Sequence, residues 1–130
     1  MGVIWDGLLG GVIGAVVGSL LTILYERTQR RCEIAIGLIE QFHSNYAGIG
    51  DAMDLMQNVT EQTDLNPVRK IGDWYETCAA LCIENVAKGA LLKKVGIDTE
   101  MRRFYESASA VSRLNDAVKL WRNMRDFCKG

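Results

Sequence analysis

The side chains best suited to catalysis or metal binding are few in this 130-residue chain. It has one histidine, His43, and four cysteines, at Cys32, Cys78, Cys82 and Cys128. An imidazole can act as a general acid or base, or bind a metal, but it needs partner groups at contact distance. Helical metal motifs with two histidines are excluded by the single His43. We therefore expect His43 to be a surface or boundary residue of a helix.

The cysteine spacing does not indicate a metal site. Cys78 and Cys82 are four residues apart, which is neither a CxxC motif nor the spacing of a zinc knuckle. In a reducing compartment such residues behave as small buried hydrophobes, whereas an oxidising compartment would make disulfides reasonable. Local Ser-His-Asp and Cys-His signatures are also missing, and the glycine-rich residues 7–14 lack the Lys-Ser/Thr of a nucleotide loop. We predict no enzyme activity, no metal site and no cofactor.

The first element that the sequence indicates is an uncharged run near the N-terminus. Residues 7–25 carry no charge over 19 positions, and their polar side chains are Ser19 and Thr22. A helix of this length reaches roughly 28 Å, close to the thickness of a bilayer's hydrocarbon core. A cleaved signal peptide fits badly because residues 1–6 contain no Lys or Arg, and a buried core helix is the second alternative. The run therefore predicts a transmembrane helix.

Basic residues follow this run, at Arg27, Arg30 and Arg31, and Trp5 and Tyr25 bracket it like an aromatic belt. By the positive-inside rule, the C-terminal side stays in the cytoplasm and the short N-terminus lies outside. We predict a single-pass protein of the bacterial inner (plasma) membrane, with membrane lipid as a partner.

Glycines in the predicted span repeat at intervals of four residues. One set is Gly10, Gly14 and Gly18, and a second pair is Gly7 and Gly11. Small residues at this spacing share one helix face and allow another backbone to approach closely. The stripe predicts packing against another copy of the chain or another protein. The alternative is that glycine is simply frequent in membrane helices.

An apolar seam follows the predicted span. Its members recur at alternating spacings of four and three residues: Ala35, Ile39, Phe42, Tyr46, Ile49, Met53 and Met56. Such a heptad pattern predicts a helix that needs a partner, which is either a second copy or another helix of the same chain. Gly48 and Gly50 favour a kink in this helix.

Two further helices are expected in the rest of the chain. Asn66 and Pro67 fit an N-cap and first helical position, so a helix is predicted over about residues 67–88. Asp98 or Thr99 would cap a third helix that reaches about residue 126. Each helix has one apolar stripe, which predicts an all-α, antiparallel three-helix bundle. The expected division is an anchor and juxtamembrane segment at 1–31 and a cytoplasmic bundle at 32–130.

Charge is distributed unevenly along a chain whose formal net charge is only -1. Residues 32–100 carry five basic and 11 acidic side chains, and residues 101–130 carry seven basic and three acidic ones. The near-neutral total disfavours an overall basic nucleic-acid binder, so no nucleic-acid partner is expected. The acidic middle and the basic last helix are instead expected to attract one another within the bundle.

Two segments resemble those of a known group of proteins: residues 73–82, DWYETCAALC, and residues 93–98, KKVGID. With the single N-terminal span, the Arg-bearing helix and the last helix with its central Trp, they resemble a family of short, uncharacterised bacterial and phage single-pass membrane proteins. The resemblance covers most of the chain and implies a cytoplasmic helical domain. That family has no assigned catalytic residues, so no functional residue is carried over.

These observations together predict a non-enzymatic single-pass membrane protein that forms a homo-oligomer through its glycine stripe. It would scaffold or anchor a cytoplasmic protein partner. The alternative is a homo-oligomeric pore, with Asp6 at its mouth and with Ser19 and Thr22 as its polar lining. Asp6 is the only charged residue before Glu26, and we favour an interfacial position in water for it. A membrane-tethered enzyme or nucleic-acid binder is the weakest hypothesis.

Overall fold

The computed structural model describes the backbone of residues 2–129 and the side chains of residues 15–129. Its elements are, in chain order, α1 (Gly2–Gln57), α2 (Asn66–Ile83), α3 (Gly89–Lys94), α4 (Ile97–Ser109), η1 (Ser112–Leu114), α5 (Asn115–Leu120) and α6 (Arg122–Lys129). No strand occurs between residues 2 and 129. The prediction of an all-α protein is confirmed.

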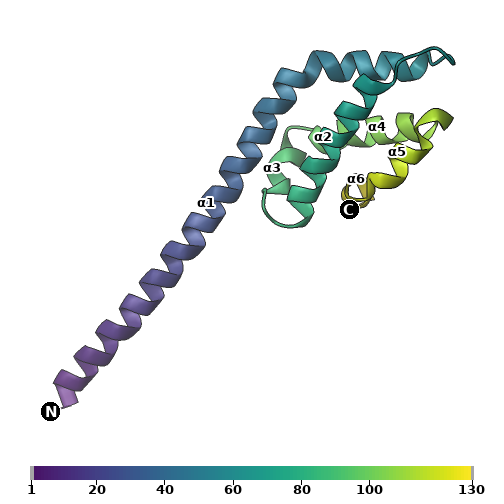
Figure 1. Ribbon diagram of the computed structural model, residues 1–130. Coiled ribbons are helices and arrows are strands. Elements are labelled where there is room, and N and C mark those ends of the chain that lie inside the picture. The colour runs from purple at the N-terminus through teal and green to yellow at the C-terminus, as the bar shows by residue number, and fades with distance from the viewer. Residues whose placement is uncertain (1, 130) are drawn as a thin grey trace.

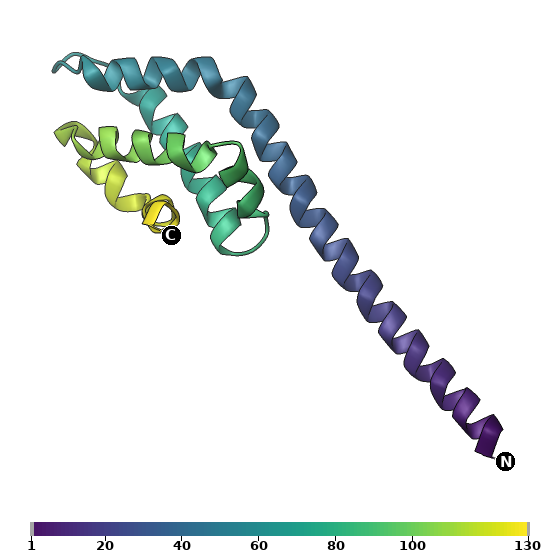
Figure 2. The same ribbon diagram turned by 180° about the vertical axis from the view of Figure 1, so that it is seen from behind.

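The helices form a compact group with one long projection. The N-terminal part of α1 extends far from the other helices, which gather beside its C-terminal half (Figures 1 and 2). α1 changes direction before it reaches the loop to α2, and α2 then runs back beside it (Figure 1). Contacts join α1 to α2, α3 and α4, and α6 lies against α2 and α4. The bundle thus closes on one half of α1 only.

The structure corrects the predicted membrane topology. Within residues 15–129, no helix has a stretch that is both long enough and apolar enough to cross a bilayer. The predicted transmembrane helix, the single-pass topology and the inner-membrane location with an external N-terminus are therefore wrong. The membrane scaffold and the pore were both inferred from the same span, and both are withdrawn.

The core is built mainly from one face of α2 and the helices that follow it. The largest fully buried side chains include Trp121, Tyr75, Phe104, Leu92, Ile97 and Met101. Four aromatic rings form a continuous row across this core, with Trp74, Tyr75, Phe104 and Trp121 separated by 5.2 to 5.8 Å between successive centroids. Tilted rings at these separations are a favourable arrangement for aromatic packing. The row connects α2 with α4 and with the residue between α5 and α6.

The third predicted helix is broken into shorter elements. Its helical structure stops at Ser109, where the hydroxyl donates to the carbonyl of Tyr105 at 2.7 Å and competes with the helical hydrogen bonds. Val111 is extended, and Trp121 separates α5 from α6 with φ -85° and ψ 56°. These breaks turn α6 back onto α2, where Met124 and Phe127 are buried.

The second helix is shorter than predicted because the chain turns after Ile83. Asn85 has a positive φ of 59°, in the left-handed region that asparagine tolerates better than most residues. The turn brings Ala87 into the core and lets the N–H of Lys88 donate to the carbonyl of Arg31 on α1 at 3.2 Å. The end of α2 is therefore fixed against α1.

Candidate functional site

His43 lies on the surface of α1. Its Nδ1 is 2.9 Å from the carbonyl oxygen of Ile39, so Nδ1 carries the proton and donates to this acceptor. The ring also makes an edge contact with Phe42, at 6.0 Å between centroids. Across residues 15–129, no group of three His, Cys, Asp or Glu side chains is placed to hold a metal ion. His43 is a helix-surface residue that is bonded to its own helix.

The cysteines are all free thiols, and two of them, Cys78 and Cys82, are buried. Burial, with a smaller contribution from Cys82, raises the pKa of Cys78 to about 12. Burial also raises the pKa of Cys82, although the positive charge of Lys93 lowers it in part. The pKa of Cys128 is raised by burial as well. Because the thiolate is the nucleophile, a raised pKa makes these thiols less reactive near neutral pH than an ordinary cysteine.

The raised pKa of Cys78 predicts a loss of stability in alkali. The thiol ionises in the unfolded chain near pH 9 but resists ionisation in the folded chain until about pH 12. Its stabilising contribution is complete below pH 9 and falls as pH rises, by up to about 1.4 kcal/mol per pH unit. Urea unfolding between pH 7 and about pH 10.5 should show this slope, and Cys78→Ala should reduce it. Cys32→Ala is the control, and equal slopes in the wild type and Cys78→Ala would contradict the prediction.

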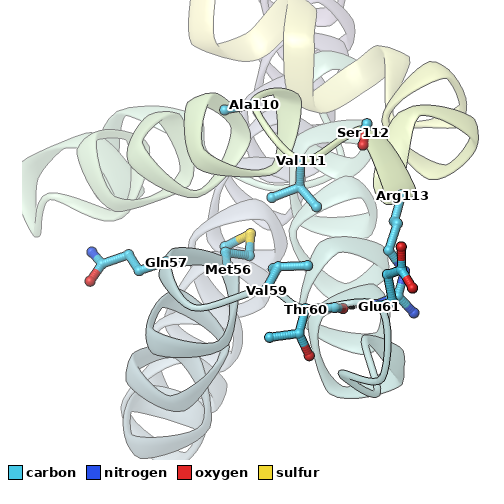
Figure 3. A pocket seen from close by; sticks show the side chains of 9 residues that line it. All are labelled: Met56, Gln57, Val59, Thr60, Glu61, Ala110, Val111, Ser112 and Arg113. Carbon is cyan, nitrogen blue, oxygen red and sulfur yellow. Dashed lines mark hydrogen bonds between the residues drawn. The ribbon is translucent and has the colours of Figure 1, made fainter.

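A cavity lies at the end of the bundle, between the α1–α2 loop and the residues after α4. Its volume is about 610 Å³, and it is lined by Met56, Gln57, Val59, Thr60, Glu61, Ala110, Val111, Ser112 and Arg113. Met56, Val59 and Val111 point toward one another and form its apolar wall, while Gln57 points away (Figure 3). Polar groups of the two loops surround that wall.

Two residues of this lining, Thr60 and Arg113, bond to each other. Arg113 donates from Nη1 to the carbonyl of Thr60 at 2.6 Å, and Arg69 donates to the carbonyl of Arg113 at 3.3 Å. Arg69 also contacts the carboxylate of Asp116 at 3.5 Å. Two effects lower the pKa of Asp116 below its usual value. The larger is the hydrogen bond from the Ala117 backbone N–H, and the smaller is the charge of Arg69. The cavity lies where two loops meet, and the residues that line it include no His, Cys or Lys.

The apolar seam of α1 packs within the chain. Ala35, Phe42, Ile49 and Met56 are buried in the common core, and Ile39 and Met53 are half-buried against it. Tyr46 differs, because 64% of it is exposed. Leu38 and Ala52, which the heptad pattern did not include, are also buried. The bend in α1 and the 3.6-residue helical period move the buried face away from a strict heptad.

The glycine stripe is described by the structure at one position only. An added Cβ at Gly18 would meet no atom within 4 Å, so this glycine faces open space. The remaining residues of the predicted packing face and pore mouth lie outside the part of the chain whose side chains are described: Asp6, Gly7, Gly10, Gly11 and Gly14. A packing role for the stripe stays a prediction.

A polar joint between α2 and α6 is not indicated by the sequence pattern. The Trp121 indole N–H donates to Asp73 Oδ1 at 3.0 Å. The carboxylate of Glu76 accepts the backbone N–H of Asn123 at 2.9 Å and that of Met124 at 2.7 Å. Asp73 and Glu76 are three residues apart on one side of α2, but nothing local indicates acceptors for donors more than 40 positions away.

The second feature that was missed is the extent of exposed apolar surface on α1. Every residue from 15 to 30 is exposed, and we call this segment the arm. Its large hydrophobic residues are exposed by 48 to 69%: Val16, Val17, Leu20, Leu21, Ile23, Leu24 and Tyr25. At 100° per residue, the six aliphatic side chains lie on one side of the helix, with Ala15, Gly18, Ser19 and Thr22 opposite. The arm therefore has a broad aliphatic face and a face of small residues.

No family model, curated protein or solved structure is significantly similar to this chain.

Proposed function

We propose that this chain is a non-enzymatic helical assembly module, in which the arm of one copy packs against the arm of a second. The observation that carries the proposal is the aliphatic face of residues 16–24, which no other helix of the chain covers (Figures 1 and 2). An apolar surface of this continuity is unusual for an isolated chain in water and typical of an interaction site.

The energetics favour a partner that covers the whole face. Burying the exposed remainder of six aliphatic side chains would contribute on the order of 10 kcal/mol per helix, at about 25 cal/mol per Å². The loss of translational and rotational freedom opposes association by roughly 4 to 15 kcal/mol. Two equal arms can exceed this cost together, because each contributes its own face. A second copy is therefore a sufficient partner.

The small-residue face of the arm is less suited to burial than the aliphatic face. Gly18 and Ser19 give it no large side chain, while Leu20 and Leu21 project from the aliphatic face. The Thr22 hydroxyl donates to the carbonyl of Gly18 at 2.9 Å, so this hydroxyl is satisfied within the helix. The aliphatic face is therefore the surface that a second copy is expected to cover.

The distribution of titratable groups supports a non-enzymatic role. Burial raises the pKa of Tyr75, and those of Cys78 and Cys82 are raised as well, but all three belong to the core of α2. None of them lines the cavity at the end of the bundle. Catalytic groups with shifted pKa values are expected inside a cleft that substrate can enter.

The mass of the full chain in aqueous buffer tests the proposal. Sedimentation equilibrium at about 10 to 100 μM should give a dimer or a larger closed oligomer. Leu20→Glu places a charge on the aliphatic face and should weaken association by roughly 100-fold or more.

Ser19→Glu is the matched control, because it introduces the same charge on the small-residue face of the same helical turn, about 100° around the helix from Leu20. It should leave the mass unchanged. A monomeric wild-type chain would contradict the proposal, and so would equal effects of Leu20→Glu and Ser19→Glu. Circular dichroism of each variant verifies that the bundle remains helical.

A further inference from the structure

Three arginines at the base of the arm face the turn that follows α2. Arg27, Arg30 and Arg31 stand at i, i+3 and i+4 on α1, so they share one side of the helix. All three line a cavity of about 190 Å³ together with Asn85. Arg27, Arg31 and Asn85 also line an adjoining cavity of about 230 Å³. The residues that line these two cavities include no carboxylate.

The backbone fixes the opposite wall of these cavities. Asn85 is held in its left-handed conformation while its N–H donates to the carbonyl of Cys82 at 3.2 Å. Its side-chain Oδ1 accepts from Arg31 Nη2 at 3.3 Å. The bond from the Lys88 N–H to the Arg31 carbonyl joins the same turn to α1. Arg31 is thus positioned through both its backbone and its guanidinium.

One of these arginines, Arg31, has a buried hydrogen-bond donor without a partner among the described residues. Arg31 Nε is buried and has no hydrogen-bond partner within the part of the chain that the structure describes. An unpaired buried donor costs about 1 to 3 kcal/mol, and more when it is charged. In residues 15–129, ion pairs within 4.0 Å involve other arginines and none of these three.

The acidic groups around the cluster do not neutralise it by direct pairing. Glu26 and Glu33 line another depression together with Arg30, without an ion pair within 4.0 Å, and Glu33 accepts from Gln29 at 3.3 Å. Glu84 precedes Asn85 and is exposed. The guanidinium groups therefore remain available to an anion that enters from the solvent.

We propose that Arg27, Arg30 and Arg31 form a binding site for a phosphate group, with Asn85 holding Arg31 in place. Guanidinium forks match the oxygens of a phosphate in pairs, and several cations suit its double charge. A small turn of the Arg31 side chain supplies its Nε–H with the acceptor it lacks. The phosphate can belong to a free phosphate ester or to a phospholipid headgroup, since Leu24 lines one of the cavities and begins the aliphatic face of the arm.

Titration of the full chain with inorganic phosphate at low ionic strength is the first test. Calorimetry should detect binding to the wild type, and Arg31→Gln should weaken it by roughly tenfold or more. Arg103→Gln is the control, because Arg103 is an exposed arginine on α4 that pairs with Glu100. Asn85→Gly keeps the left-handed turn and removes Oδ1, so it should weaken binding with the midpoint of thermal unfolding preserved.

Vesicles distinguish the two sources of phosphate. One set contains phosphatidylglycerol in phosphatidylcholine, and the other contains a fatty acid that gives the same surface charge without an additional phosphate group. Binding of inorganic phosphate that depends on Arg31 assigns a free phosphate ester. Binding only to the phosphatidylglycerol vesicles, again lost in Arg31→Gln, assigns a headgroup. Equal behaviour of Arg31→Gln and Arg103→Gln in both tests, or equal binding to both vesicle types without phosphate binding, overturns the proposal.

Discussion

Replacing Gly72 with alanine should lower the free energy of unfolding by about 2 to 3 kcal/mol. Gly72 is buried on α2, and a Cβ built there would overlap the six-membered ring of Trp121. Trp121 is only 2% exposed and its indole N–H donates to Asp73, so the ring cannot move aside without losing packing and that hydrogen bond. The gain in helix propensity from Gly to Ala, about 1 kcal/mol, is smaller than this cost.

Gly37→Ala is the matched control for this substitution. Gly37 is also helical, but an added Cβ there would meet no atom within 4 Å, so alanine should stabilise the chain by roughly 0.5 to 1 kcal/mol. Urea unfolding followed by circular dichroism measures both variants. In a Trp121→Leu background, Gly72→Ala should cost much less, because the overlapping ring is gone. A Gly72→Ala protein as stable as Gly37→Ala would show that Trp121 does not fill this space.

Glu76→Gln should lower the free energy of unfolding by about 2 kcal/mol. The Glu76 carboxylate accepts two backbone N–H groups, from Asn123 and Met124, in the first turn of α6. These donors have no acceptor within their own helix, and the positive end of the helix dipole favours a negative charge beside them. The glutamine amide offers only one acceptor oxygen, and its NH₂ group would face the second donor.

Hydrogen exchange distinguishes this local effect from a general loss of stability. The amides of Asn123 and Met124 should exchange faster in Glu76→Gln than amides in α2, because α6 loses its attachment first. Glu84→Gln is the control, since Glu84 is exposed just beyond the end of α2, and its effect should stay within about 0.5 kcal/mol. Equal stability of the two variants would mean that the cap contributes little to the docking of α6.

The local sequence was sufficient for the class of fold and for the start of α2. Asn66 and Pro67 marked the beginning of that helix to within one residue, because proline lacks the N–H that a first turn leaves unpaired. The stripe after residue 97 indicated helix but not its interruptions. Met101, Phe104, Ala108, Val111, Leu114, Trp121 and Met124 are all buried, so their helical spacing persists through breaks that the pattern does not reveal.

The composition of the uncharged run near the N-terminus does not by itself predict where the run lies relative to the other helices. Its composition indicated a membrane span, whereas the structure describes the side chains of only part of the run and finds no crossing helix in residues 15–129. What the structure contributes is the position of that run relative to the bundle. Residues 15–30 lie beyond the contacts that begin near Arg31, and this separation leaves the aliphatic face exposed.

The residue pattern alone indicates that the chain is helical, that a metal site with two histidines is excluded, and that basic residues follow Glu26 and are frequent after residue 100. Three contacts become visible only in the folded chain: the Trp121 ring packs against Gly72, Glu76 caps α6, and Asn85 accepts a hydrogen bond from Arg31. Helical periodicity acts between residues three or four apart. The hydrogen bonds of Glu76 and Asn85 join residues 47 to 54 positions apart. They form because the breaks after Ser109 and Ile83 bring distant turns together.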